Sequence, residues 1–166
     1  MRSSDLTGII AAAIERLNGV PQERLGEILP ERRVLGIARA ARIKPWGSAW
    51  HLGVLLIAAD GRIFETGEIV RAREEVRRGF TAESQRQRAV LAAAARRGGF
   101  AEAEAVHLGW REVDLGAIES GGTSGPLALR DGEPAVRWSH SGGYVPLESY
   151  LDERIELLRH PPQGAT

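Results

Sequence analysis

Residues 50–59 read WHLGVLLIAA and are followed by Asp60-Gly61, and this stretch decides the predicted fold. Apolar side chains occupy both parities of the run, which is typical of a strand that is covered on both faces. Asp-Gly favours a two-residue type I′ turn. The stretch therefore predicts a β-hairpin in which residues 62–71 return as the antiparallel partner strand.

The two-residue loop also predicts the register of this hairpin. It places Ala59 opposite Arg62, and it makes Glu68 the diagonal neighbour of His51 at about 7 Å between backbones. A carboxylate at that position would orient the imidazole ring. The alternative is a histidine whose hydrogen bonds are satisfied within the sheet.

A second hairpin is predicted from Asp131-Gly132, which separates residues 127–130 from residues 135–139. In this register Leu127 faces Val136. Pro134 would pair with Leu129 at a position that exchanges no hydrogen bonds, which suits a residue without an N–H. Residues 34–43 and 106–113 are predicted as two further strands.

Three helices are predicted from apolar periodicity and capping residues. The first spans residues 5–17, with Ser4 or Asp5 as the candidate cap. The second spans residues 82–97, with Thr81 as the cap and Gly98-Gly99 as the end, and the third spans residues 146–159. Residues 21–33 suit a short helix and a loop, and Asp114 is a candidate cap for a short turn of helix. The order of elements predicts a single α+β domain over residues 1–166, with a largely antiparallel sheet, two hairpins and an N-terminal helical segment at 1–33.

Composition excludes several classes of protein. The 166 residues include 22 basic and 22 acidic side chains and no cysteine, which excludes disulfides, thiolate metal sites and cysteine nucleophiles. No apolar run approaches the ~20 residues of a membrane span, and no secretory signal is evident. We expect a cytoplasmic protein that does not engage a membrane.

Charge is uneven along the chain. Eight arginines and three glutamates lie between residues 71 and 97, whereas eleven acids and four arginines lie between residues 102 and 156. The ordinary interpretation is two solvated faces that pair with each other, within a chain or across a homodimer. We do not expect nucleic acid as a partner, because few aromatic residues accompany the basic segment.

Two loops rich in Gly and Ser form the candidate site. Residues 120–125 read SGGTSG before the second hairpin, and residues 139–143 read SHSGG after it. Extrapolated register brings Ser124 near Ser139 and Gly122 near Ser141 at the open end of the hairpin. The candidate catalytic residues are Ser124, His140 and Ser141, and the candidate ligand-binding residues are Gly122, Thr123, Gly142 and Gly143.

This set is compatible with two chemistries. Glycine N–H groups bind small anions, and a hydroxyl, an imidazole and N–H donors are the components of serine acyl transfer. Neither loop forms a Gly-x-Ser-x-Gly elbow, and two ordinary connecting loops would have the same composition. No metal or cofactor is expected, because the four histidines lack zinc-site spacing and the phosphate-loop and dinucleotide motifs are absent.

The helix at 82–97 raises one further question. If Val90, Leu91 and Ala94 mark its buried side, Glu83 and Gln87 lie on that same side. Buried polar groups need partners, and nearby arginines or the sheet edge would supply them.

Three segments carry a resemblance to a known group. RRGFTAESQRQR (77–88), GPLALRDG (125–132) and YLDERI (150–155) resemble a family of small actinobacterial proteins that are sometimes labelled glutaminase. The label implies amide hydrolysis. Serine-dependent glutaminases use Ser-x-x-Lys, whereas Ala41 stands three residues before Lys44 here.

The residues leave three functions open. The first is a binding domain for a small anionic ligand at the Gly/Ser loops. The second is a Ser/His amide hydrolase, as the glutaminase label implies. The third is an interaction protein that works as a homo-oligomer through its oppositely charged patches.

Overall fold

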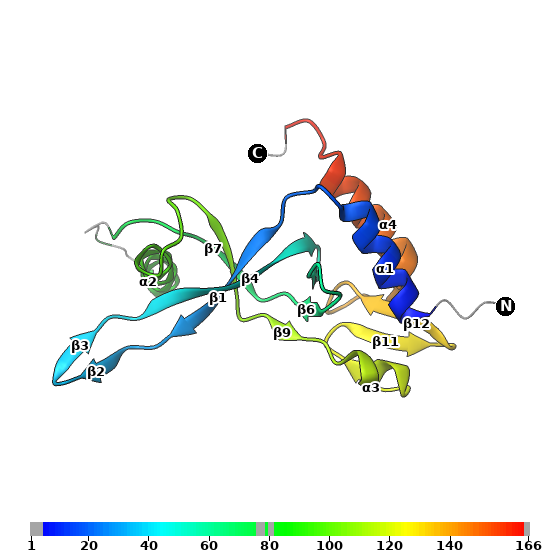
Figure 1. The fold of residues 1–166 in the computed structure, drawn as a ribbon, viewed down its shortest axis with the longest axis horizontal. Coiled ribbons are helices and arrows are strands. Elements are labelled where there is room, and N and C mark those ends of the chain that lie inside the picture. Colours follow the sequence, from blue (N-terminus) through cyan, green and yellow to red (C-terminus); the bar gives the residue numbers. More distant parts are fainter. Residues whose placement is uncertain (1–4, 76–78, 80–81, 165–166) are drawn as a thin grey trace. The chain divides into compact units, whose positions relative to one another are not determined.

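The helices form where capping and periodicity place them. In the computed structural model, residues 5–75, 79 and 82–164 are described, and they form four helices and thirteen strands (Figure 1). These helices are α1 (Leu6–Leu17), α2 (Glu83–Arg97), α3 (Leu115–Glu119) and α4 (Leu147–Arg159). Asp5 caps α1 by accepting from the N–H of Thr7, and Asp114 caps α3 by accepting from the N–H of Ala117. The predicted cap Thr81 lies outside the described residues. The α+β class is confirmed.

The fold divides into two compact units. Unit 1 comprises Met1–Gln22, Ala49–Thr66 and Arg111–Thr166, and unit 2 comprises Glu23–Ser48 and Gly67–Trp110. Strand β4 (Arg42–Leu52) has residues in both. None of the described helices has the length and hydropathy to cross a membrane.

Unit 1 contains the second hairpin as predicted. Its four-stranded antiparallel sheet has the order β10-β11-β12-β13, and Leu127 faces Val136 while Leu129 faces Pro134. Asp131 and Gly132 both have positive φ, as a type I′ turn requires. The four strands are β10 (Thr123–Ser124), β11 (Leu127–Arg130), β12 (Glu133–Arg137) and β13 (Tyr144–Pro146).

The first hairpin differs from the prediction at Gly53. Residues 50–59 do not form one strand, because Gly53 adopts φ 67° and the chain reverses there. Strand β4 pairs with β5 (Leu55–Ile57) across this turn, so that His51 faces Leu56. Apolar residues on both parities therefore reflect the buried end of β4 and the short buried strand β5 rather than one continuous strand.

The register after Asp60 is also shifted by one residue. Strand β6 (Ile63–Glu65) places Ile63 opposite Ile57, and the N–H of Ala58 donates to the carbonyl of Arg62. The loop thus holds three residues and ends with Gly61 at φ 91°, the pattern of a type I turn with a glycine bulge. The predicted positive φ of Gly61 is confirmed, and the two-residue loop is wrong. Strand β9 (Arg111–Glu112) pairs with β6.

Tyr150 of α4 fixes the turn at Gly53. Its hydroxyl donates to the carbonyl of Leu52 at 3.0 Å and accepts from the N–H of Val54 at 2.9 Å. Around it, the apolar faces of α1 and α4 pack with the sheet residues into one core, and the two helices lie side by side (Figure 1). Arg16 of α1 also forms ion pairs with Asp152 and Glu156 of α4.

Unit 2 is built on a mixed sheet. Its strands follow the order β7-β8-β1-β4, in which β1 (Glu23–Leu29) and β8 (Ala105–Leu108) are parallel and β7 (Glu68–Arg71) is antiparallel to β8. Helix α2 packs on this sheet through its alanines and Leu91, and the buried Phe100 belongs to the same core.

Several predictions for residues 1–33, 62–71 and 106–113 are wrong. Residues 23–29 form β1 rather than helix, so the N-terminal segment 1–33 is helical only as far as Leu17. Residues 62–71 form two strands, and Glu68 pairs with Leu108 rather than with the strand that carries His51. Residues 106–113 are likewise divided between β8 and β9.

The buried side of α2 also differs from the prediction. Val90 is 57% exposed, and Glu83 and Gln87 are exposed too. Ala93, Ala94 and Ala95 are the buried residues of the helix. Small side chains at its C-terminal end let the backbone approach the sheet, so the polar residues of the first two turns need no buried partners.

Candidate functional site

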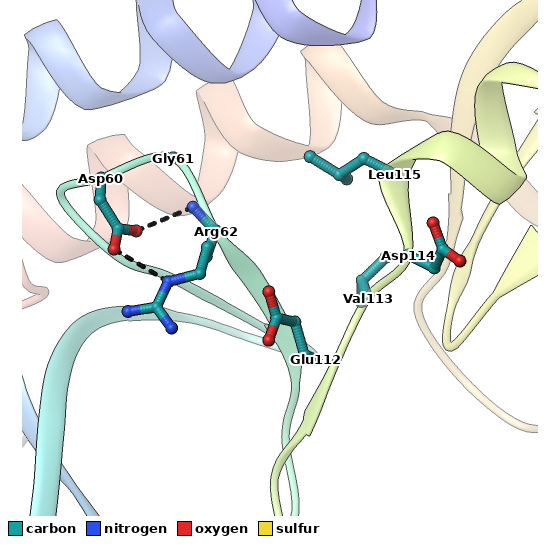
Figure 2. Close-up of a pocket in the computed structure, with 7 residues that line it drawn as sticks. All are labelled: Asp60, Gly61, Arg62, Glu112, Val113, Asp114 and Leu115. Atoms are coloured by element: carbon teal, nitrogen blue, oxygen red, sulfur yellow. Dashed lines mark hydrogen bonds and ion pairs between the residues drawn. The ribbon is translucent and has the colours of Figure 1, made fainter.

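An open groove lies among the described residues of unit 1. Its volume is about 620 Å³, and it is lined by Asp60, Gly61, Arg62 and residues 112–115. Figure 2 shows the β5–β6 loop on one side and the segment from β9 into α3 on the other. Because the loop ends on a glycine bulge and Asp114 caps α3, both walls are fixed by local hydrogen bonds. A volume of this size accommodates several side chains.

The groove is acidic with an apolar lining. Its charged residues are Asp60, Glu112 and Asp114 against Arg62, and Val113 and Leu115 supply the apolar part. Asp60 accepts from the backbone N–H of Arg62 at 3.1 Å and from its Nε at 2.8 Å. The backbone N–H is the larger cause that lowers the pKa of the Asp60 carboxyl, so this side chain remains ionised.

Glu112 is the carboxylate best placed to bind a partner. It is exposed on β9 opposite Phe64, and among the described residues its side chain forms no ion pair or hydrogen bond. Asp60 and Asp114, by contrast, accept hydrogen bonds from their own neighbours. A cation that enters the groove would therefore find Glu112 available.

The predicted Gly/Ser site is arranged differently from the extrapolated register. Ser124 lies on β10 opposite Leu127, and Thr123 lies opposite Ala128. Strand β10 flanks β11 on the side away from β12, so Ser124 and Val136 are two strand spacings, about 10 Å, apart. The predicted pairing of Ser124 with Ser139 and of Gly122 with Ser141 is therefore wrong.

Hydrogen bonds engage three of the candidate residues. The Ser124 hydroxyl accepts from the N–H of Asp114 at 2.8 Å, and the N–H of Gly122 donates to the carbonyl of Ala117 at 2.9 Å. His140 accepts through its carbonyl from Arg137 at 2.7 Å. In the described part of the chain, no hydrogen bond joins Ser124 to His140.

The remaining candidates lie in the loop between β12 and β13. Ser141 and Gly143 are exposed, and Gly142 is half-buried. A Cβ on Gly142 would clash with the hydroxyl of Ser139. The Ser139 side chain would have to move to admit a side chain at this position.

Unit 2 contains a carboxylate–imidazole pair that sequence reasoning missed. His107 on β8 is fully buried, and its Nε2 contacts Glu23 of the neighbouring strand β1. A carboxylate in this position orients the imidazole ring. No local signal reveals the pair, because residues 21–33 suit a helix and only the parallel pairing of β1 with β8 brings the two side chains together.

A second missed feature is an exposed hairpin of unit 2, which we call the arm. It consists of β2 (Arg32–Val34) and β3 (Ile37–Arg39), joined by a turn at Leu35-Gly36. Figure 1 shows it as a two-stranded ribbon that extends beyond the other strands of unit 2. The sequence pattern favours a single strand over residues 34–43, and this prediction is wrong because Leu35 and Gly36 both adopt positive φ.

The arm has an apolar tip and a basic stem. Leu35 is 97% exposed, and Ile37 and Val34 are also exposed. Arg32 and Arg39 face each other across the two strands, where like charges are destabilising. Among the described residues neither of these arginines forms an ion pair or a side-chain hydrogen bond, so the stem carries uncompensated positive charge.

Comparison of the chain with protein-family models, with curated protein sequences and with solved structures finds no match. The geometry and charge of the described residues are therefore the basis for assigning a function.

Proposed function

We propose that the chain is an interaction protein that self-associates through its two oppositely charged units. Unit 2 contains 14 basic and nine acidic residues, a net charge of +5, whereas unit 1 contains eight basic and 13 acidic residues, a net charge of −5. This segregation is the observation that carries the proposal. Complementary potentials of this kind steer association and fix the orientation of two copies.

Exposed apolar side chains add support. Among the described residues, the exposed large apolar side chains of unit 2 are Ile28, Val34, Leu35, Ile37, Trp46, Ile69 and Val90, and those of unit 1 are Trp138 and Leu157. Single exposed apolar residues are ordinary, but Val34, Leu35 and Ile37 are contiguous at the tip of the arm. Contiguous apolar surface rimmed by charge is characteristic of a protein-binding surface.

The other two functions have less support from the geometry. The anion-binding hypothesis needs free glycine N–H groups, and the N–H of one candidate, Gly122, donates to the carbonyl of Ala117 instead. The hydrolase hypothesis needed a base beside the Ser124 hydroxyl, whereas that oxygen accepts a backbone N–H. We therefore do not expect amide hydrolysis that depends on Ser124 and His140.

Sedimentation velocity over a salt series tests the proposal. Charge-driven contacts are screened as the Debye length falls from about 30 Å at about 0.01 M salt to about 3 Å at about 1 M. We expect a dimer or larger species at low salt and high protein concentration, and progressive dissociation as salt is added. A protein that sediments as a monomer at about 0.01 M salt would contradict the proposal.

A further inference from the structure

The turn at the tip of the arm has an unusual residue. Leu35 adopts φ 52°, followed by Gly36 at φ 79°. In such type I′ turns Asn-Gly is preferred, because residues other than Gly, Asn and Asp resist the left-handed region. A leucine there costs conformational free energy, so its presence requires a compensating gain.

The described residues provide no compensating contact at Leu35. Its side chain is 97% exposed, and its neighbours Val34 and Ile37, which pair across the ribbon, are exposed as well. A strained, solvent-exposed leucine points to a role outside the chain, since strain of this kind persists where function requires it.

From this arm and the groove of unit 1, we infer that the arm of one copy docks in the groove of a second copy, with Leu35 as the anchor. This inference rests on the proposed self-association and identifies its interface. Leu35 would pack on Val113 and Leu115, which form the apolar part of the groove. Arg32 and Arg39 would approach Glu112.

The arm and the groove carry opposite net charges. Arg32 and Arg39 repel each other on one face of the ribbon, and Glu112 is an exposed carboxylate without an ion-pair partner among the described residues. Placing Glu112 beside the two arginines relieves the repulsion and neutralises the groove. The arm and the groove thus offer each other both an apolar contact and a partner of opposite charge. A partner protein without charge would supply only the apolar contact.

Each copy carries one arm and one groove. Two copies that exchange arms reciprocally form a closed two-fold dimer, whereas one-way docking extends into a chain of copies. The sedimentation profile distinguishes these: the closed dimer reaches a limiting size as protein concentration rises, and the chain does not.

Leu35→Asn is the variant that separates anchoring from folding. Asn-Gly is the preferred sequence for this turn, so the arm remains formed while the apolar anchor is removed. Burial of a leucine side chain in an interface strengthens binding roughly tenfold or more. We therefore expect the dissociation constant for self-association of the Leu35→Asn variant at low salt to be roughly 10- to 100-fold higher than that of the wild-type protein. The matched control is Val90→Gln, which removes an exposed aliphatic residue from α2 of the same unit and should leave association unchanged.

Cross-linking locates the interface, because the chain contains no cysteine. A chain carrying Leu35→Cys is mixed with a differently tagged chain carrying Leu115→Cys under mild oxidation. We expect disulfide-linked heterodimers at low salt, and far fewer when Val90→Cys replaces Leu35→Cys. Wild-type protein that is monomeric at low salt refutes the proposed function itself. Salt-sensitive association that Leu35→Asn does not weaken, or that yields no Leu35–Leu115 cross-link, overturns only the arm-in-groove interface.

Discussion

Replacement of Tyr150 by Phe tests how helix α4 holds the β4–β5 turn. The substitution keeps the ring, which is 5% exposed in the core, and removes only the hydroxyl. Two hydrogen bonds are lost, to the carbonyl of Leu52 at 3.0 Å and from the N–H of Val54 at 2.9 Å. The Leu52 carbonyl belongs to a buried residue, so water does not readily replace its partner.

The expected cost follows from these two bonds. At about 0.5–1.5 kcal/mol each, their loss should lower the free energy of unfolding by roughly 1–3 kcal/mol. For a chain of this size that corresponds to a fall of roughly 2–12 °C in Tm. Urea unfolding monitored by circular dichroism measures the free energy, and calorimetry measures Tm.

Tyr144→Phe provides the matched control. The ring of Tyr144 packs against the guanidinium of Arg130 at 4.2 Å, and its hydroxyl forms no hydrogen bond with the described residues. This variant should change the free energy of unfolding by less than about 0.5 kcal/mol. Equal stability of the Tyr150→Phe variant and the wild-type protein would refute the clamping role of the hydroxyl.

Four further substitutions test other parts of the structure. Gly61→Val should lower the free energy of unfolding by at least about 1 kcal/mol in urea titrations, because a β-branched residue resists φ 91°; an unchanged midpoint would contradict the glycine bulge. Gly98→Ala should destabilise unit 2 by roughly 1–3 kcal/mol in thermal melts, because its Cβ would clash with the backbone oxygen of Ile43, and a neutral effect would show that α2 ends elsewhere. Ser124→Ala and His140→Ala should each leave any amide hydrolysis of the purified protein unaltered, because no hydrogen bond joins the two residues in the described part of the chain; loss of a measured activity in both would restore the hydrolase hypothesis.

The sequence predicts the elements whose signals are local. The three long helices begin and end within one residue of their predicted bounds because caps and apolar periodicity act within a few turns. The hairpin at Asp131-Gly132 also has its predicted register, since a type I′ turn fixes pairing by itself. Asp114 likewise caps the short helix α3 as its position predicts.

Prediction fails where a local sequence signal is compatible with two backbone conformations. Asp60-Gly61 suits both a two-residue turn and a three-residue loop with a glycine bulge, and the second occurs. Gly53 and Leu35 adopt positive φ within stretches that otherwise resemble strands. Glu23 and His107 meet only through parallel pairing over 84 residues of sequence separation, which no local pattern encodes.

The predicted pairing of the Gly/Ser loops fails for the same reason. It extrapolates the register of one hairpin beyond the last pair that its turn fixes. The chain instead turns at Gly125, which has φ 53°, so that β10 pairs with the far side of β11. The groove and the arm are likewise assembled from turns whose conformation the sequence leaves ambiguous.

Charge exchange between two variants tests the arm-in-groove association most directly. Arg39→Glu and Glu112→Arg should each weaken self-association at about 0.01 M salt, because each creates like charges between arm and groove. Mixing the two variants presents the unaltered arm of one with the unaltered groove of the other, so sedimentation should show that association recovers in the mixture. A mixture that associates no better than either variant alone would contradict the account.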